Sequence, residues 1–403
     1  MHLIDIPQFI KTHIIKREVS FFEDDIQKNH DLLTSKIEGK SVLVVGGAGT
    51  IGSAYIKAIL CFKPRKLVVV DTNENGLTEL TRDLRSTMGQ YVPEEYKTYP
   101  MNFGDPVFAK MFHANKPFHI VANFAAYKHV RSEKDQFSIE AMIDNNVIRA
   151  KDFLDLLLQN KPEHFFCVST DKAANPVNVM GATKKLMEEV IMAYSHDFQI
   201  TTARFANVAF SNGSLLDGYL QRIIKSQPIS CPSDINRFFV SPEESGQICM
   251  LACLLGSSGD ILFPKLAADE MVNFKEITLD FFKAMSRKIQ VCTSEEEAKR
   301  MSCMLTNTSP YPVYFFDSNT SGEKLYEEFY TDEDVLDLSS YSSLGVIKNA
   351  KRISIPQVVL CLNEIKSILS NETYSKEVIV HILKHYLPDF RHIETGKSLD
   401  TRM

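Results

Sequence analysis

A glycine-rich turn between two short apolar runs is the feature that most constrains how this chain folds. The run Ser41–Val45 is almost wholly apolar, as expected for a strand that is buried on both faces of a parallel sheet. It leads directly into the turn Gly46–Gly52, a helical run Ser53–Leu60 and a second apolar run Lys66–Val70. This order predicts a βαβ unit with its glycines at the first turn, and hence an α/β fold of the Rossmann type with a doubly wound parallel sheet.

The spacing of the glycines gives each of them a role in holding a dinucleotide. Gly46 permits the tight turn, Gly49 lets the backbone approach a pyrophosphate, and Gly52 lets the helix pack closely on the strand. The helix that begins here directs free N–H groups and a partial positive charge at the phosphates. Thr50 and Ile51 lie in the same turn and are included among the predicted cofactor-binding residues.

Asp71 ends the second strand of this unit. A carboxylate at this position binds the ribose hydroxyls of adenosine and repels a 2′-phosphate. The residues that follow, Thr72–Glu74, include no Arg that would accept such a phosphate. The sequence therefore predicts NAD rather than NADP as the cofactor.

A fourth predicted strand, His119–Phe124, leads into further candidate binding residues. Ala125 and Ala126 are small, so the backbone can pass close to a cofactor there. Lys128 and His129 follow at the carboxyl end of the strand, where α/β sheets bind ligands. They either contact a substrate or simply reach solvent.

The loop after the fifth predicted strand, Phe165–Ser169, contains an acid next to a base. These residues are Asp171 and Lys172, and a Pro/Asn-containing loop separates them from a helix that begins near Met180. Lys184 lies four residues further on, so it projects from the same helical face as Met180. The acid and the base form either an ion pair that holds the loop or a catalytic pair.

Scattered polar residues beyond the sixth predicted strand suit a charged substrate. Asn207 follows that strand, and the polar turn from Ser211 to Ser214 suits a diphosphate or a base. Arg237 could bind a diphosphate through two parallel hydrogen bonds, or could lie on the surface. Glu323 could accept hydrogen bonds from ribose hydroxyls, or could stabilise a helix start through the helix dipole. We assign all of them to substrate binding.

Composition narrows the class of protein. The 403 residues are 44% hydrophobic, which is enough for one large α/β domain with a lobe or for two domains. The net charge of -6 and the absence of a long basic block argue against a nucleic-acid partner. The eight cysteines show no zinc spacing, so we expect no metal and a reducing, cytoplasmic location. No apolar run is long enough for a membrane span.

Four regions are expected along the chain. The first begins with an apolar stripe at helical spacing that includes Ile6, Ile10 and Ile14, and it is expected to pack on the domain or on a neighbouring subunit. The regions are an N-terminal helical extension (1–38), an NAD-binding Rossmann domain (39–208), a substrate-binding lobe with some return to the Rossmann core (209–350) and a C-terminal helical extension (351–403).

Seven segments resemble one group within the extended short-chain dehydrogenase/reductase superfamily, the nucleotide-sugar 4,6-dehydratases of capsule and flagellin glycosylation. The most specific segment reads STDKAANPVNVMGATK, and the seven together span roughly residues 40–330. They are Gly46–Gly52, Ala125–Val130, Ser169–Lys184, Arg204–Val208, Ser211–Ser214, Arg237–Phe239 and Gly322–Glu328.

The resemblance implies UDP-N-acetylglucosamine as the substrate, NAD as a bound catalyst and a role in bacterial surface-glycan or related sugar biosynthesis. Short-chain dehydrogenases generally carry Tyr where Met180 stands, and members with Met resemble the C5-retaining type. The implied product is UDP-2-acetamido-2,6-dideoxy-α-D-xylo-hex-4-ulose. Asp105 occupies a position where the superfamily usually contacts adenine, and a helix N-cap is an equally compatible role. The chain resembles the soluble forms of the group and is expected to form a homo-oligomer.

The implied reaction is an internal redox cycle: C4 is oxidised, water is lost across C5 and C6, and the hydride returns at C6. Neutral Lys172 would take the C5 proton and protonated Asp171 would donate to the leaving C6 hydroxyl, from opposite sides of the sugar. These roles need a lowered pKa for Lys172 and a raised pKa for Asp171, which burial could supply.

The other residues of the motif have supporting roles in this scheme. Thr170 would hydrogen-bond the C4 oxygen, and Lys184 would bind the nicotinamide ribose. The thioether of Met180 has no exchangeable proton, so the base for the C4 hydroxyl stays open between Asp171, Lys184 and a bound water.

Three other functions are compatible with the sequence. A C5-inverting dehydratase would differ only in stereochemistry. A nucleotide-sugar 4-epimerase would use the same C4 oxidation, but it has no use for an adjacent acid and base. A non-catalytic NAD-binding subunit would explain the missing Tyr at position 180 but not the retained Thr170, Asp171, Lys172 and Lys184.

Overall fold

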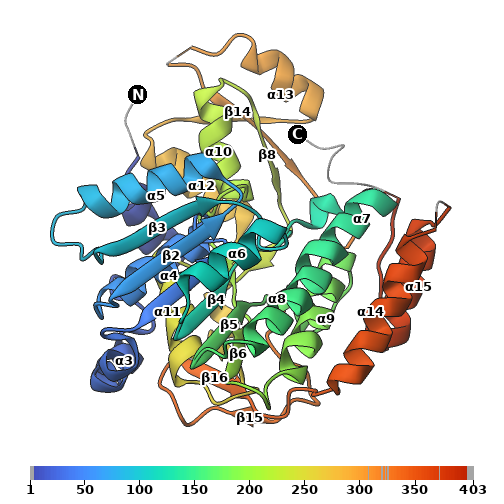
Figure 1. The fold of residues 1–403 in the computed structure, drawn as a ribbon. Coiled ribbons are helices and arrows are strands. Elements are labelled where there is room, and N and C mark those ends of the chain that lie inside the picture. The colour runs from blue at the N-terminus through green and yellow to red at the C-terminus, as the bar shows by residue number, and fades with distance from the viewer. Residues whose placement is uncertain are drawn as a thin grey trace.

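A nine-stranded sheet lies at the centre of the described part of the chain (Figure 1). The computed structural model describes residues 4–306, 308–318, 321, 322, 324, 326–371 and 373–396. The strand order is β15-β16-β11-β6-β5-β4-β1-β2-β3. In chain order, the bounds are β1 Ser41–Val45, β2 Lys66–Asp71, β3 Glu95–Pro100, β4 Ile120–Asn123, β5 His164–Val168, β6 Ile200–Ala203, β11 Ile261–Pro264, β15 Leu336–Asp337 and β16 Leu344–Ile347.

The sheet is parallel from β3 to β11, and β16 and β15 add an antiparallel edge. The central strands are buried on both faces because helices cover both of them; β1, for example, is buried along its whole length. This arrangement confirms the predicted doubly wound α/β fold. It also places the carboxyl ends of β1, β4, β5 and β6 along one edge, where α/β sheets bind ligands.

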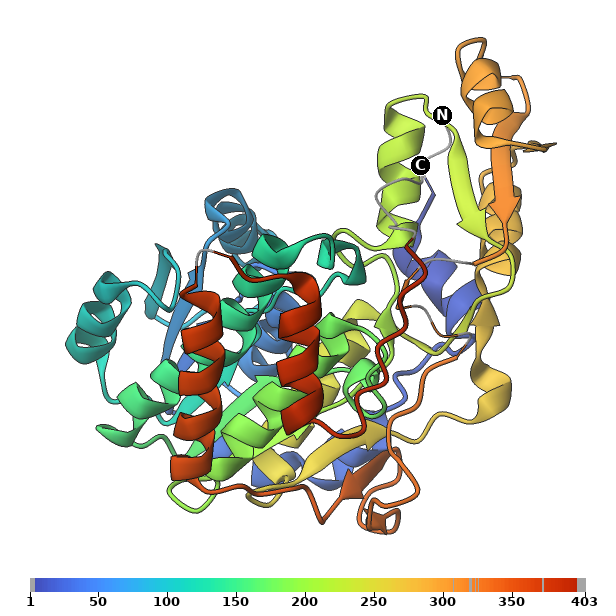
Figure 2. The same cartoon turned by 90° about the vertical axis from the view of Figure 1, so that its right-hand side faces the viewer.

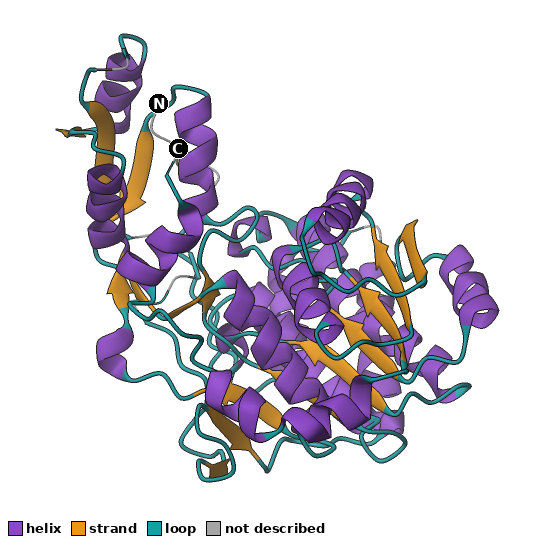
Figure 3. Cartoon of the chain, turned by 90° about the vertical axis from the view of Figure 1, so that its left-hand side faces the viewer, coloured by secondary structure: helices purple, strands orange, loops and turns teal. Residues whose placement is uncertain are grey.

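Helices pack in layers on the two faces of the sheet (Figures 1 and 3). Helices α4 and α11 pack against each other on one face, and α8 and α9 pack together on the other. The bounds are α4 Thr50–Leu60, α5 Glu74–Ser86, α6 Pro106–Asn115, α7 Gln136–Ile143, α8 Arg149–Leu158, α9 Val179–Ala193 and α11 Pro242–Leu255. Helices α14 (Ile355–Leu369) and α15 (Lys376–Tyr386) form a further layer outside α9 (Figure 2).

A smaller lobe projects from the carboxyl edge of the sheet (Figure 2). Its three parallel strands lie in the order β13-β14-β8 and have their own apolar core. Phe9, Ile10 and Ile14 of the N-terminal extension belong to that core. The sequence predicted that this segment packs on the domain or on a neighbouring subunit, and it packs on the lobe of its own chain. The lobe elements are α10 Leu215–Ile224, β8 Ile229–Pro232, α12 Phe274–Ala284, β13 Ile289–Cys292, α13 Glu295–Ser302 and β14 Tyr311–Phe316.

Short elements complete the described chain. The N-terminal extension contains α1 Ile6–Phe9, a π-helical turn Ile10–Ile14, α2 Glu23–Lys28 and α3 His30–Ile37. Two-residue strand pairs, β7 Asn207–Val208 with β10 Phe239–Val240 and β9 Asn236–Arg237 with β12 Val272–Asn273, link the lobe to the main sheet. The remaining single turns are Val130–Ser132, Asp171–Ala173 and Ala268–Glu270.

The sequence predicts one long helix over Glu140–Leu158, but the structure divides it. Helix α7 ends at Ile143, a π-helical turn covers Asp144–Ile148, and α8 follows. Asn146 lies in that turn, accepts a hydrogen bond from Tyr127 N at 2.8 Å and donates one to Tyr127 O at 2.9 Å. The irregular turn therefore ties the helix to the loop that leaves β4. Periodicity of apolar residues does not register such a change of hydrogen-bond pattern.

Within the described residues, every helix is too short or too polar to cross a lipid bilayer.

Candidate functional site

Three adjoining cavities follow the carboxyl edge of the sheet. The glycine-turn cavity has a volume of about 230 Å³, the central cavity about 330 Å³ and the lobe cavity about 660 Å³. Ala126 and Lys128 line both the glycine-turn cavity and the central cavity. His129, Lys172 and Asn207 line both the central cavity and the lobe cavity. A molecule with two ends could therefore extend from the central cavity in either direction.

Two glycines of the turn are required by close backbone contacts. Gly46 has a φ of +75°, and a Cβ there would stand 2.5 Å from the backbone nitrogen of Ala125. A Cβ at Gly52 would stand 2.3 Å from the carbonyl oxygen of Gly46. These contacts bring the turn against the backbone that leaves β4, so the turn and Ala125 form one wall of the glycine-turn cavity.

The start of α4 faces the same cavity. Gly49 is its N-cap residue, and no side chain caps the helix there. Gly49, Thr50, Ile51 and Gly52 all line the cavity, which leaves the first turn of the helix available to a ligand. This donor set fits the pyrophosphate of a dinucleotide.

Asp71 lines the glycine-turn cavity at the end of β2. Its Oδ2 accepts a hydrogen bond from Ala48 N at 2.9 Å, and its Oδ1 accepts one from Asn73 N at 2.9 Å. These bonds fix the carboxylate beside the turn. Asp105 is placed differently: it is exposed at the N-cap position of α6, accepts a hydrogen bond from Asn102 N at 3.2 Å and does not line this cavity.

The predicted acid, Asp171, and the predicted base, Lys172, both line the central cavity. Lys172 Nζ donates to Asp171 Oδ1 at 3.0 Å, and Thr170 Oγ1 donates to the same oxygen at 2.8 Å. Asp171 is 4% exposed. The two side chains therefore contact each other directly, whereas the sequence suggested that they reach opposite sides of a substrate. Their turn begins at Thr170, so the three groups converge because they share one short turn after β5.

The expected lowering of the Lys172 pKa is wrong for the structure described here. Burial disfavours the charged ammonium, but the carboxylates of Asp171 and Glu327 outweigh burial and raise the pKa of Lys172. Glu327 Oε1 lies 3.7 Å from Lys172 Nζ, and this carboxylate was not predicted from sequence. The expectation considered burial alone and omitted a second anion from a segment 155 residues away in the chain.

Helix α9 supplies the remaining two residues of the predicted motif. Asn178 caps the helix by accepting a hydrogen bond from Gly181 N at 2.7 Å. Met180 and Lys184 are buried, and both line the central cavity. Lys184 Nζ donates to the carbonyl oxygen of Val168 at 2.7 Å, and burial lowers the pKa of Lys184.

The edge between the central cavity and the lobe is polar. Ser211 and Ser214 line the central cavity, and Ser214 also caps α10 by accepting from Asp217 N at 3.3 Å. Lys128 Nζ donates to Asn212 O at 3.2 Å, which joins the loop after β4 to the loop before α10. Burial, with the nearby cations Lys128 and Arg131, lowers the pKa of His129.

The lobe cavity is rich in cations. Arg131, Lys134, Lys172, Arg222 and Arg237 line it, and Asp217 is the only acidic residue among the described residues of its lining. Arg237 is only 7% exposed, and its guanidinium donates to the carbonyl oxygens of Asn236 at 2.9 Å and Lys324 at 2.8 Å. The excess of positive charge suits an anionic ligand such as a diphosphate. The predicted substrate contact Glu323 lies outside the described residues.

Three buried polar atoms at the lobe cavity have no hydrogen-bond partner among the described residues. They are Asn207 Nδ2, Arg222 Nε and Ser230 Oγ. Asn207 was predicted from its position after β6. Arg222 and Ser230 were not predicted because neither has another candidate site residue beside it in its helix or strand. Only the packing of α10 against β8 brings them to one cavity. Unpaired buried donors are costly, so a ligand with oxygen acceptors fits here.

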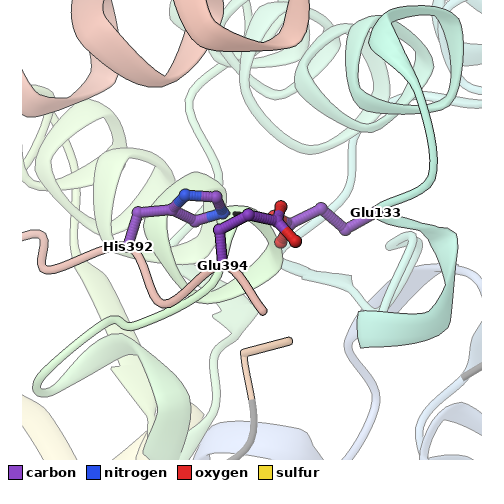
Figure 4. Close-up of side chains that lie close together, drawn as sticks. All are labelled: Glu133, His392 and Glu394. Atoms are coloured by element: carbon purple, nitrogen blue, oxygen red, sulfur yellow. Dashed lines mark hydrogen bonds and ion pairs between the residues drawn. The ribbon is translucent and has the colours of Figure 1, made fainter. Parts of the chain in front are cut away.

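A cluster of charged side chains, Glu133, His392 and Glu394, lies next to the start of α9 (Figure 4). Glu133 accepts a hydrogen bond from Val179 N at 2.6 Å and contacts His392 Nε2 at 2.5 Å. Glu394 lies beside them in the figure. Lys376 Nζ lies 3.3 Å from Glu133 and 2.5 Å from Glu394, so the two carboxylates share one ammonium. The cluster is an ion-pair network that joins the C-terminal tail to the start of α9.

The C-terminal tail runs beside the loop that joins Lys172 to α9. Arg391 N donates to Pro176 O at 3.1 Å, and Ile393 N donates to Val177 O at 2.9 Å. On its other side, Ile393 O accepts from Gly322 N at 3.1 Å. The tail thus folds back onto the body of the same chain and holds the loop between Lys172 and α9.

The doubly wound Rossmann-type fold is shared with two solved structures. Pen from Bacillus thuringiensis has a TM-score of 0.61 at 20% identity, with 82% of this chain and 98% of that chain covered. DesIV of Streptomyces venezuelae, a dTDP-glucose 4,6-dehydratase solved with NAD bound, has a TM-score of 0.56 at 14% identity and coverages of 79% and 94%. Within this fold class, the chain belongs to the polysaccharide biosynthesis protein family, whose model matches residues 42–349.

Three curated relatives are 25–29% identical to this chain over the aligned residues. An uncharacterized membrane protein of Methanocaldococcus jannaschii is 29% identical over 83% of this chain and 96% of its own length. The probable polysaccharide biosynthesis protein EpsC of Bacillus subtilis is 27% identical over 75% of this chain, which spans only 47% of that relative. A UDP-N-acetylglucosamine 4,6-dehydratase (inverting) of Campylobacter jejuni is 25% identical over 58% of this chain and 70% of its own length. These relatives support the predicted group of nucleotide-sugar enzymes.

Proposed function

We propose that this protein is a UDP-N-acetylglucosamine 4,6-dehydratase that works with bound NAD. The observation that carries the proposal is the contact between Asp171 and Lys172 at the base of a cavity that opens toward both a dinucleotide cradle and a cation-rich lobe. An epimerase needs no such acid–base pair, whereas elimination of water needs an acid and a base close together.

The glycine turn, the start of α4 and Asp71 would hold NAD. NAD supplies the hydride acceptor for C4 and the hydride donor for C6. The cations and unpaired donors of the lobe cavity would hold the uridine diphosphate, which leaves the sugar in the central cavity. We also propose, from the sequence, a cytoplasmic homo-oligomer.

The hydrogen bond between Lys172 and Asp171 suggests how both groups reach their active protonation states. Transfer of one proton from Lys172 Nζ to Asp171 Oδ1 breaks an N–H bond and forms an O–H bond, and it leaves a neutral amine beside a neutral carboxylic acid. Exclusion of water by the bound sugar favours this neutral pair over the ion pair. Lys172 then takes the C5 proton, and Asp171 gives its proton to the departing C6 hydroxyl.

The C4 hydroxyl needs a different proton acceptor. Thr170 lines the central cavity and would hydrogen-bond the C4 oxygen. Lys184, or a water held by it, is the candidate that burial supports, because a lowered pKa makes its neutral form more accessible. Asp171 is the second candidate, and Met180 has no proton to exchange.

We propose the C5-retaining stereochemistry from Met180, although the Campylobacter relatives are named as inverting. Incubation of the protein with UDP-N-acetylglucosamine in deuterated water is expected to give one 4-keto-6-deoxy sugar with the gluco-derived configuration at C5. NMR of the product reports the reaction, the C5 configuration and the entry of deuterium at C5. An L-configured product would correct the stereochemistry alone, and UDP-N-acetylgalactosamine would identify an epimerase.

An epimerase is the second candidate because UDP-glucose 4-epimerases are also relatives, such as that of Rickettsia canadensis at 23% identity over 82% of this chain. The NMR experiment separates the two activities. Tight binding of NAD without turnover of any nucleotide sugar would instead indicate a non-catalytic subunit.

Replacing Asp71 by Ser is expected to lower the affinity for NAD by about tenfold and to raise the affinity for NADP relative to NAD. The reason is the loss of the carboxylate that binds ribose hydroxyls and repels a 2′-phosphate. Binding of each cofactor to cofactor-free protein by calorimetry is the measurement. Asp105→Ser serves as the comparison, since Asp105 lies outside the cavity. A loss of NAD affinity in Asp105→Ser would support the adenine contact, and unchanged cofactor preference in Asp71→Ser would contradict the role of Asp71.

A further inference from the structure

A buried carboxylate behind the site contacts both the candidate base and the candidate diphosphate-binding arginine. Glu327 is 6% exposed, and its Oε1 lies 3.7 Å from Lys172 Nζ and 3.7 Å from Arg237 Nη2. Lys172 lines both the central and the lobe cavity, whereas Arg237 lines the lobe cavity. One oxygen atom of Glu327 therefore lies between the two parts of the site.

Glu327 contributes charge rather than orientation. Arg237 is already held by the carbonyl oxygens of Asn236 and Lys324, and Lys172 is held by its hydrogen bond to Asp171. The separations of 3.7 Å from Glu327 are too long for hydrogen bonds but suit a shared counter-ion. The second oxygen, Oε2, is buried without a hydrogen-bond partner in the described chain.

We propose that Glu327 is a positioning residue that acts through Lys172 and Arg237, holding the base charged and offsetting the positive charge of the diphosphate site until a nucleotide sugar binds. This inference rests on the proposed function and deepens it. In this proposal, one carboxylate that contacts neither the sugar nor the cofactor sets two properties of the site. They are the affinity for the diphosphate and the ease with which Lys172 gives up its proton.

The charged groups around this carboxylate support the proposal. Lys172 faces Asp171 and Glu327, which raise its pKa, and Arg237, which lowers it. Burial and Asp171 raise the pKa of Glu327 above its usual value, although Lys172, Arg237 and Lys324 oppose this rise. Among the described residues, the carboxylates of Asp171 and Glu327 thus lie close to Lys172, and Glu327 also lies close to Arg237. The diphosphate of a substrate is a third anion, so it competes with Glu327 for the charge of Arg237.

Removing the negative charge of Glu327 is expected to strengthen UDP binding, whereas damage to the site would weaken it. Glu327→Gln leaves Arg237 and Lys172 in place and removes one negative charge, so UDP is expected to bind about fivefold more tightly. Loss of the same charge makes the ammonium form of Lys172 less favourable, so transfer of its proton to Asp171 becomes easier. Because the neutral pair is the reactive form, kcat is expected to rise by up to about tenfold.

Glu328→Gln is the matched control. Glu328 carries the same charge one residue further on, but it is exposed, accepts from Asn175 at 2.8 Å and contacts Lys324 at 3.9 Å. This variant is expected to match the wild type in UDP affinity and in kcat. Glu327→Asp retains the charge and is expected to keep the wild-type kcat. Glu327→Leu also removes the charge, so the same result is expected from it. It serves as the second variant if Glu327→Gln does not fold.

UDP affinity by calorimetry and kcat with UDP-N-acetylglucosamine at neutral pH are the two measurements. Weaker UDP binding in Glu327→Gln, or a kcat that is unchanged or lower, would overturn the proposal. Equal effects of the changes at 327 and 328 would also overturn it. If the wild-type protein does not turn over UDP-N-acetylglucosamine, the proposed function fails, but the difference in UDP affinity between the two variants still decides whether Glu327 shares the charge of Arg237.

Discussion

Replacing Asp171 by Asn is expected to lower the rate of dehydration by about 10²- to 10⁴-fold, the range for loss of general acid–base catalysis. Asn cannot accept the proton that Lys172 donates at 3.0 Å, and it cannot deliver a proton to the C6 hydroxyl. Oxidation at C4 does not need this acid if Lys184 or a water takes the hydroxyl proton. The variant is therefore expected to accumulate reduced nicotinamide when it is mixed with UDP-N-acetylglucosamine.

Absorbance of the reduced nicotinamide and formation of the keto sugar separate the two half-reactions. Full turnover by Asp171→Asn would contradict the acid role. Loss of both half-reactions would assign Asp171 to C4 oxidation as well. Asp197→Asn is a suitable control because Asp197 forms an ion pair with Lys161 at 3.1 Å on the surface, away from the three cavities. That variant is expected to keep wild-type turnover.

Replacing Glu188 by Ala is expected to lower the free energy of unfolding by about 3–5 kcal/mol, since it leaves a buried guanidinium without its anion. Arg204 is 1% exposed and contacts Glu188 through two hydrogen bonds, of 2.9 and 2.7 Å. Ser169 Oγ donates to the same carboxylate at 2.6 Å, and Arg204 also donates to Phe329 O at 3.0 Å. The pair therefore joins β5, α9, β6 and the segment that follows Glu327.

Denaturant unfolding measures this loss, with Asp197→Asn as a surface control whose expected change is below about 1 kcal/mol. The pH dependence has a defined sign. Burial raises the pKa of Glu188, but Arg204 and Ser169 lower it by more, so the folded-state pKa is depressed. The contribution of the pair is thus present at neutral pH and is lost as the pH falls through that pKa. A change at Glu188 no larger than at Asp197 would show that the pair is replaceable.

The sequence predicts the central part of the fold well because its signals are local. Strand β1, the glycine turn and α4 each follow from residues that are adjacent in the chain, and the steric contacts of Gly46 and Gly52 show why glycine is needed there. The C-terminal extension (351–403) was also predicted to be helical, and it contains α14 and α15.

The charge state of the site could not be predicted in the same way. Lys172 and Asp171 are neighbours in sequence, but Glu327 approaches them from another segment, and Asp171 and Glu327 together reverse the expected pKa shift of Lys172. Likewise, Arg222 and Ser230 become candidate site residues only because α10 and β8 bring them to the lobe cavity. Residue types and short spacings report which groups are available, whereas distances between distant segments decide what those groups do.

The position of the tail has a consequence for how the protein is made. Residues 391–394 hold the loop of Pro176 and Val177 and meet Glu133 under α9, yet the ribosome adds them after all the elements that they join. The sheet can form while synthesis continues, but this loop gains its support only when the tail has left the exit tunnel and folded back. A growing chain therefore forms the glycine-turn cavity before the loop between Lys172 and α9 is held in place.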